Sequence, residues 1–147
     1  MNRSLIVLIF SCTVAGVMSF ASNTIQGQSA GQNKSERDYA NEAWADGYHG
    51  HPADEVRVCR EGLVSFPGDP DLRELLAQGL SDTGAYEEAE KLFKGIIYSN
   101  NKEDKSVLPW ALGDYWDMLK KQGRNDEADA IAQRIHILAT SPGRTDN

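Results

Sequence analysis

Cysteine and basic charge are both scarce in this 147-residue sequence, and each shortage excludes a class of protein. The two cysteines are Cys12 and Cys59, so a chain that loses Cys12 with an N-terminal leader can form no internal disulfide. The 15 Lys and Arg residues are outnumbered by 22 Asp and Glu residues, and the net charge is −7. Because nucleic-acid binding requires a clustered basic face, and the basic residues here are scattered among acids, we expect no nucleic-acid partner.

Motifs for catalysis are also missing. No serine or cysteine lies in a nucleophile-elbow pattern, and no glycine-rich phosphate loop follows a strand pattern. His49 and His51, close to Asp46 and Asp54, form the only cluster that suggests a metal, but they fall in a turn and His136 is far along the chain. We therefore expect no catalytic residue, no metal and no cofactor; a metal protein or enzyme built around the two turn histidines is the third alternative.

The N-terminus has the pattern of an export signal. Arg3 is followed by an apolar run over 5–18 and by the small residues Ser19 and Ala21, which predicts a signal peptide over 1–21. The run has about fourteen residues, fewer than the ~20 that span a bilayer, so an uncleaved membrane anchor is the alternative. We expect an exported protein, periplasmic or secreted, that contacts a membrane only if the leader is not cleaved.

The rest of the chain divides into three parts. Residues 22–34 are polar and lack hydrophobic periodicity, which predicts a flexible linker. Residues 35–140 carry apolar residues at helical spacing, and 141–147 read as a disordered tail. The sequence therefore predicts one all-α domain between two unstructured segments.

Six helices in three pairs are predicted for this domain. Their expected starts are Ser35 and Asp69 as caps, Pro52 and Pro109 as first-turn prolines, and the segments at Tyr86 and Asn125. The expected core positions share one face of each helix: Ala43, Trp44, Tyr48, Val56, Cys59, Leu63, Phe66, Leu72, Leu75, Leu76, Leu80, Ala89, Leu92, Phe93, Ile96, Ile97, Leu112, Tyr115, Trp116, Leu119, Ala128, Ile131, Ala132, Ile135 and Leu138.

Aromatic residues offer a second interpretation, because aromatic side chains dominate binding surfaces. Trp44, Tyr48, Trp110, Tyr115 and Trp116 could together grip a peptide. We expect most of them in the core instead. Trp110 is the expected exception, since it lies on the side of its helix opposite Tyr115.

A repeat connects the three pairs. Gly50, Gly84 and Gly123 end the odd-numbered helices at separations of 34 and 39 residues, and 34 is the tetratricopeptide period. The segment from Gly84 to Ala89, followed by Phe93, resembles the turn and second helix of that family. The resemblance covers about residues 36–139 and implies a right-handed stack of about three antiparallel helical hairpins, a TPR-like α-solenoid. Glu55 departs from the pattern, because it stands where Ala89 stands one repeat later.

The resemblance also implies a function. In proteins of this kind ligands bind the concave face made by the first helix of each hairpin, so we expect an adaptor that binds a protein or peptide without catalysis. The candidate contact residues on that face, which is mixed in charge, are Glu74, Gln78, Ser81, Trp110, Asp117, Lys120 and Lys121. Only the two lysines could hold a peptide's terminal carboxylate, and a carboxylate clamp is therefore not expected.

Self-association is the second alternative. No polar capping helix follows the last predicted helix, so nothing in the sequence covers Ile131, Ile135 and Ile137. This end would then pack on another copy or on a partner, giving a homo-oligomer through the C-terminal hairpin or a structural subunit of an envelope assembly.

Overall fold

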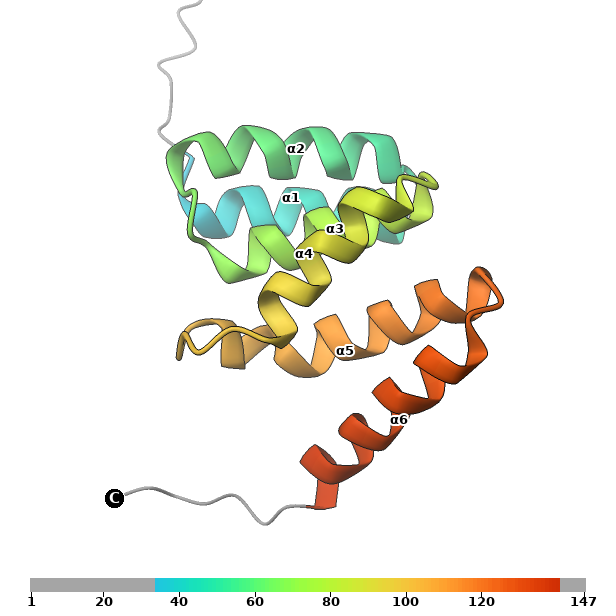
Figure 1. Cartoon of the computed structure of the whole chain (residues 1–147). Coiled ribbons are helices and arrows are strands. Elements are labelled where there is room, and N and C mark those ends of the chain that lie inside the picture. Colours follow the sequence, from blue (N-terminus) through green and yellow to red (C-terminus); the bar gives the residue numbers. More distant parts are fainter. Residues whose placement is uncertain (1–33, 141–147) are drawn as a thin grey trace, which may run out of the picture. The chain divides into compact units, whose positions relative to one another are not determined.

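The computed structural model describes residues 34–140, and this part of the chain is entirely helical, as predicted (Figure 1). The predicted leader, the tail and all of the linker except Lys34 lie outside these residues. None of the helices described is long and apolar enough to cross a membrane. The six helices are α1 (Glu36–Tyr48), α2 (Pro52–Ser65), α3 (Pro70–Asp82), α4 (Tyr86–Ile97), α5 (Asp104–Lys121) and α6 (Asn125–Thr140).

Two helix starts have the side-chain caps that the sequence predicts. At α1 the Ser35 hydroxyl accepts the Asp38 N–H at 3.3 Å, and the Asp38 carboxylate accepts the Ser35 N–H at 2.9 Å. At α3 the Asp69 carboxylate accepts the Leu72 N–H at 2.8 Å. Because these amides have no partner inside their own helix, each cap stabilises the start by about 1 kcal/mol.

The three glycine turns share one backbone geometry. Gly50, Gly84 and Gly123 have φ angles of +79°, +85° and +73°, in the left-handed region that favours glycine. In each turn the residue after the glycine donates its N–H to the carbonyl five positions earlier, for example Ala85 to Leu80 at 2.8 Å. These turns end α1, α3 and α5 in the same way, as the spacing of the glycines predicts.

The expected start of the fifth helix is wrong. α5 begins at Asp104 rather than near Pro109, which lies inside the helix. The reason is a contact that local sequence does not reveal: the buried Asp104 carboxylate accepts from Arg73 of α3 at 2.8 Å. Val107 in the next turn is also buried, so tertiary packing holds the added turn in place.

Contacts between helices follow the order of the chain. Each helix contacts the next one, and in addition α1 contacts α3 and α3 contacts α5 (Figure 1). Within residues 34–140 the backbones of no other two helices pack together. The helices that begin each pair therefore lie against one another, while the second helices meet only through side chains: Arg60 of α2 pairs with Glu88 of α4, and Arg134 of α6 donates to the Ile97 carbonyl of α4.

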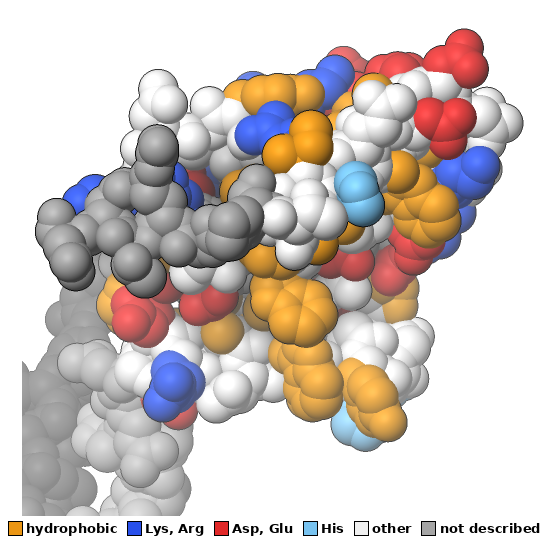
Figure 2. All heavy atoms as spheres, turned by 90° about the horizontal axis from the view of Figure 1, so that it is seen from below, with side chains coloured by type: hydrophobic (Ala, Val, Ile, Leu, Met, Phe, Trp, Pro, Cys, Tyr) orange, Lys and Arg blue, Asp and Glu red, His pale blue; other side chains and the backbone are white. Residues whose placement is uncertain are grey.

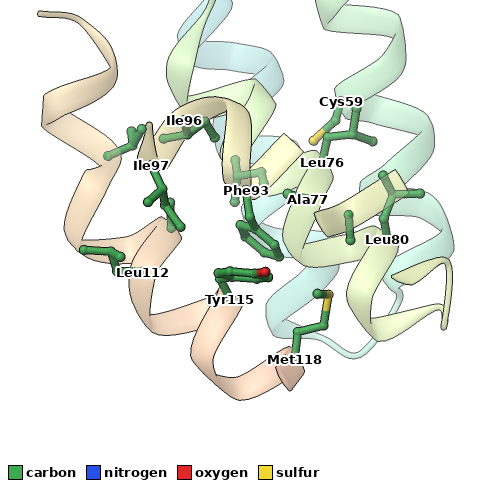
Figure 3. Close-up of a cluster of buried hydrophobic side chains, with 14 of the residues drawn as sticks. Cys59, Leu76, Ala77, Leu80, Phe93, Ile96, Ile97, Leu112, Tyr115 and Met118 are labelled. Carbon is green, nitrogen blue, oxygen red and sulfur yellow. The ribbon is translucent and has the colours of Figure 1, made fainter. Parts of the chain in front are cut away.

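The core is a continuous cluster along the middle of this arrangement (Figure 3). Phe93 and Tyr115 meet in it with their ring centroids 5.7 Å apart. The predicted leucines of α3 and the thiol of Cys59 are buried, and burial raises the pKa of that thiol to about 12. Cys59 is therefore a packing residue, as predicted.

The predicted core is wrong at the C-terminal end. Ala132 is exposed and Leu138 is 45% exposed, whereas Ala128 and Ile131 are buried. The cause is that α6 packs against α5 and reaches α4 only through the Arg134 side chain, so only the stripe that faces α5 is covered.

Candidate binding groove

A groove of about 650 Å³ lies where α1, α3 and α5 come together. All of its lining residues belong to these three helices or to the cap of α3. The lining residues that bear on function are Trp44, Asp71, Glu74, Gln78, Trp110 and Asp114. The surface made by the first helix of each pair is therefore hollowed. The sequence predicts that a ligand binds on this surface.

Two tryptophans are the main apolar part of the groove. Trp110 of α5 is 71% exposed, as expected, and Trp44 of α1 is 59% exposed. Tyr48 is also exposed and stacks on Trp44 with the ring centroids 5.3 Å apart. The prediction that Trp44 and Tyr48 belong to the core is therefore wrong, because only the Ala43 face of α1 is buried.

Tyr115 and Trp116 behave differently from these exposed rings. Tyr115 is buried, as expected, and its hydroxyl donates to Glu90 at 3.0 Å. Trp116 is half-buried and packs against the core cluster. Neither side chain lines the groove.

Acidic side chains predominate among the charged residues of the groove. Five acids and one base, Arg37, line it, so the expectation of a mixed charge is wrong. Hydrophobic and acidic side chains also lie next to one another on the face of the molecule shown in Figure 2. The groove therefore combines exposed aromatic surface with negative charge.

Glu74 is the most buried acid of the groove. Its side chain is 7% exposed, and its Oε1 atom has no hydrogen-bond partner within residues 34–140. Burial, and then the neighbouring carboxyl group of Asp114 on α5, together raise the pKa of Glu74 to about 9. Glu74 therefore holds its proton at neutral pH, next to an ionisable neighbour on the opposite helix.

A second buried acid, Glu55 of α2, lies outside the groove. It is 1% exposed, and neither of its carboxyl oxygens has a hydrogen-bond partner in the described part of the chain. A Cβ atom built on Gly47 would lie 2.7 Å from its Oε2 atom, and one built on Gly79 would lie 3.1 Å from it. The missing side chains of these two glycines make room for the acid that departs from the repeat pattern.

The expected contact residues divide into two groups. Glu74, Gln78 and Trp110 line the groove. The remaining four do not: Ser81 is buried, Asp117 is exposed outside the lining, Lys120 donates to Asn125 at 2.5 Å, and Lys121 forms an ion pair with Asp82 at 2.8 Å.

Sequence reasoning did not name Asp71 and Asp114 of the groove, and it named Trp44 only in the alternative interpretation in which aromatic residues grip a peptide. Helical spacing contained the signal for the two acids, because Asp71 lies three positions before Glu74 and Asp114 four positions after Trp110. Trp44 carried no such signal, since its exposure depends on which face of α1 is covered.

The turn histidines take part in no cluster suited to a metal. Among residues 34–140 no group of three or more His, Cys, Asp and Glu side chains is arranged to hold an ion. His49 instead places its Nδ1 atom 2.6 Å from the Ala45 carbonyl oxygen. This contact belongs to the end of α1.

Compared with protein-family models, with curated proteins and with solved structures, the chain gave no match.

Proposed function

We propose that this chain is an exported, TPR-like adaptor that binds a polypeptide through the groove between α1, α3 and α5. The observation that supports the proposal most is the groove itself, formed by first helices alone and lined by Trp44 and Trp110. Exposed tryptophans beside a hollow are typical of binding surfaces, because they bury a large apolar area at little cost in side-chain entropy. No catalytic step is part of the proposal.

The repeat geometry supports the TPR-like part of the proposal. The turns at Gly50, Gly84 and Gly123 have the same φ sign and the same hydrogen bond. The helix backbones pack against their neighbours in the chain, and each first helix also packs against the first helix of the next pair. Each pair leaves an apolar stripe that the next pair covers, which is the physical basis of stacked repeats. We propose that the three pairs form such a stack, with the groove on its concave face.

Selection from a randomised peptide library displayed on phage tests the binding function. Peptides selected on the intact protein should bind at least about tenfold more weakly to a Trp44→Ala, Trp110→Ala variant, because the aromatic contact area is lost. Val64→Ala is the control, since Val64 is an exposed apolar residue of α2 outside the groove. Selected peptides that bind all three proteins equally would show that the groove is not the binding site.

Self-association through α6 is the second candidate function. Ile137 is 60% and Leu138 is 45% exposed on a helix whose backbone packs against α5 alone. A second copy covering these side chains would make the chain a structural subunit. This candidate predicts a dimer that persists on dilution and that is lost in an Ile137→Ser, Leu138→Ser variant.

A further inference from the structure

Three acids of the groove lie without an ion pair. Several acids outside it have a basic partner, such as Glu88 with Arg60 at 3.0 Å and Glu90 with Arg124 at 2.7 Å, whereas others, Glu87 and Asp129 among them, are exposed to solvent. Asp71, Glu74 and Asp114 have no ion pair with any residue of 34–140. The groove therefore contains acids without a basic partner at the place where a ligand would lie.

Glu74 gives a second and independent indication of a ligand. Its Oε1 atom is buried at the lining of the groove and accepts no hydrogen bond from residues 34–140. Buried polar atoms of folded proteins are nearly always hydrogen-bonded, since an unpaired one destabilises the fold. A donor supplied by a ligand would remove this deficit.

The aromatic residues favour the same kind of ligand. Trp110 and Asp114 are four positions apart on α5, so the indole and the carboxyl group project from the same face of that helix. A cation is attracted to the face of a tryptophan ring as well as to a carboxylate, and the aliphatic part of a Lys or Arg side chain packs on such a ring.

We propose that the groove recognises a polypeptide segment by one of its Lys or Arg side chains, which binds beside the adjacent carboxyl groups of Glu74 and Asp114 and packs against Trp110. The inference rests on the proposed function and specifies the chemistry of the partner. The bound cation donates to the unpartnered oxygen of Glu74 and adds a positive charge to a groove lined by five acids and one base. Residues that flank it contact Trp44 across the groove.

The test uses a peptide selected on the intact protein and a copy of it in which every Lys and Arg is replaced by Gln. We expect the Gln copy to bind at least about tenfold more weakly, and the affinity of the original to fall as salt rises from about 0.05 M to about 0.5 M. Isothermal titration calorimetry measures both affinities.

Matched protein variants locate the effect. Glu74→Gln with Asp114→Asn should bind the original and the Gln copy with equal, weak affinity. Glu87→Gln with Asp129→Asn makes the same two amide replacements at exposed positions outside the groove, and it should bind as the intact protein does. Circular dichroism melting checks the fold of each variant. If the first variant does not fold, Asp114→Asn alone changes only a half-buried side chain and should still reduce the difference between the two peptides.

The possible failures are distinguishable. Selected peptides without Lys or Arg, or a Gln copy that binds as well as the original, would overturn the cation inference. If that binding is nevertheless lost in the Trp44→Ala, Trp110→Ala variant, the proposed function stands. Binding that is independent of both tryptophans would overturn the inference and the proposed function together.

Discussion

Glu55 shows how far one residue can depart from a repeat pattern without loss of the fold. Its position is occupied by Ala89 one repeat later, and both residues are buried. An acid is accommodated here because Gly47 and Gly79 have no side chains where its carboxyl group lies. No base among residues 34–140 forms an ion pair with this acid, so its ionisation is costly.

The burial of Glu55 predicts that stability falls with rising pH. Burial, and then the negative charges of Asp82, Asp114 and Asp46, raise the pKa of Glu55 from 4.5 to about 8 in the folded protein. Above pH 4.5 the folded state keeps a proton on Glu55 that the unfolded state releases. The ionisation of Glu55 therefore leaves the free energy of unfolding unchanged below pH 4.5 and lowers it as the pH rises to about 8. At about 1.4 kcal/mol for each pKa unit, the loss is on the order of a few kcal/mol.

Urea titrations across this pH range measure the effect. Glu55→Gln should give a shallower fall in the free energy of unfolding, because the amide does not ionise. Part of the slope should remain in this variant, since burial also raises the pKa of Glu74, to about 9. The exposed Glu87→Gln should leave the slope unchanged. A flat profile in the intact protein would show that Glu55 ionises without penalty.

At the scale of the helix, two glycines with opposite roles make a matched pair. Gly84 has a φ of +85° in the turn after α3, whereas Gly113 lies inside α5, where an added Cβ atom would meet nothing within 4 Å. Gly84→Ala should lower the free energy of unfolding by about 1 kcal/mol, because alanine is strained in the left-handed region. Gly113→Ala should raise it by up to about 1 kcal/mol through helix propensity.

Thermal melting and urea denaturation of the two variants check this prediction. Equal destabilisation by both substitutions would contradict it, since each adds the same methyl group and only the backbone conformation differs.

Helix starts and turns could be predicted from the sequence because their chemistry is local. Ser35 and Asp69 bond to amides three positions away, and Gly84 needs no contact beyond its own turn. The start of α5 was missed because it depends on Asp104 meeting Arg73, a residue 31 positions earlier.

The groove was predicted in part for the same reason. Trp110 lies opposite a well-defined apolar stripe, and helical spacing alone predicts its exposure. The exposure of Trp44 has another cause, because α1 is the first of the six helices described. No described helix comes before α1 that could cover the face carrying Trp44. Pairing of Glu74 with Asp114 requires α3 and α5 to be adjacent, which only the fold shows.

For the whole molecule, the order of contacts predicts an uneven distribution of stability. α3 contacts α1, α2, α4 and α5, whereas α6 packs against α5, reaches α4 only through the Arg134 side chain, and has two buried residues, Ala128 and Ile131. In a stack of repeats each unit is stabilised by its neighbours, so a terminal helix opens at lower free energy than a central one. Hydrogen exchange should therefore be fastest, among the six helices, in the amides of α6 and slowest in those of α3.

Hydrogen exchange at several protein concentrations tests whether a second copy covers the exposed part of α6. If self-association buries Ile137 and Leu138, the protection of α6 amides should rise with concentration and be lost in the Ile137→Ser, Leu138→Ser variant. An exposed apolar residue of α2 gives the control, because Val64→Ser should leave this concentration dependence unchanged. Equal protection of α6 and α3 at every concentration would mean that the six helices open as one cooperative unit. That result would contradict the packing of each helix on its neighbours, from which the stack is inferred.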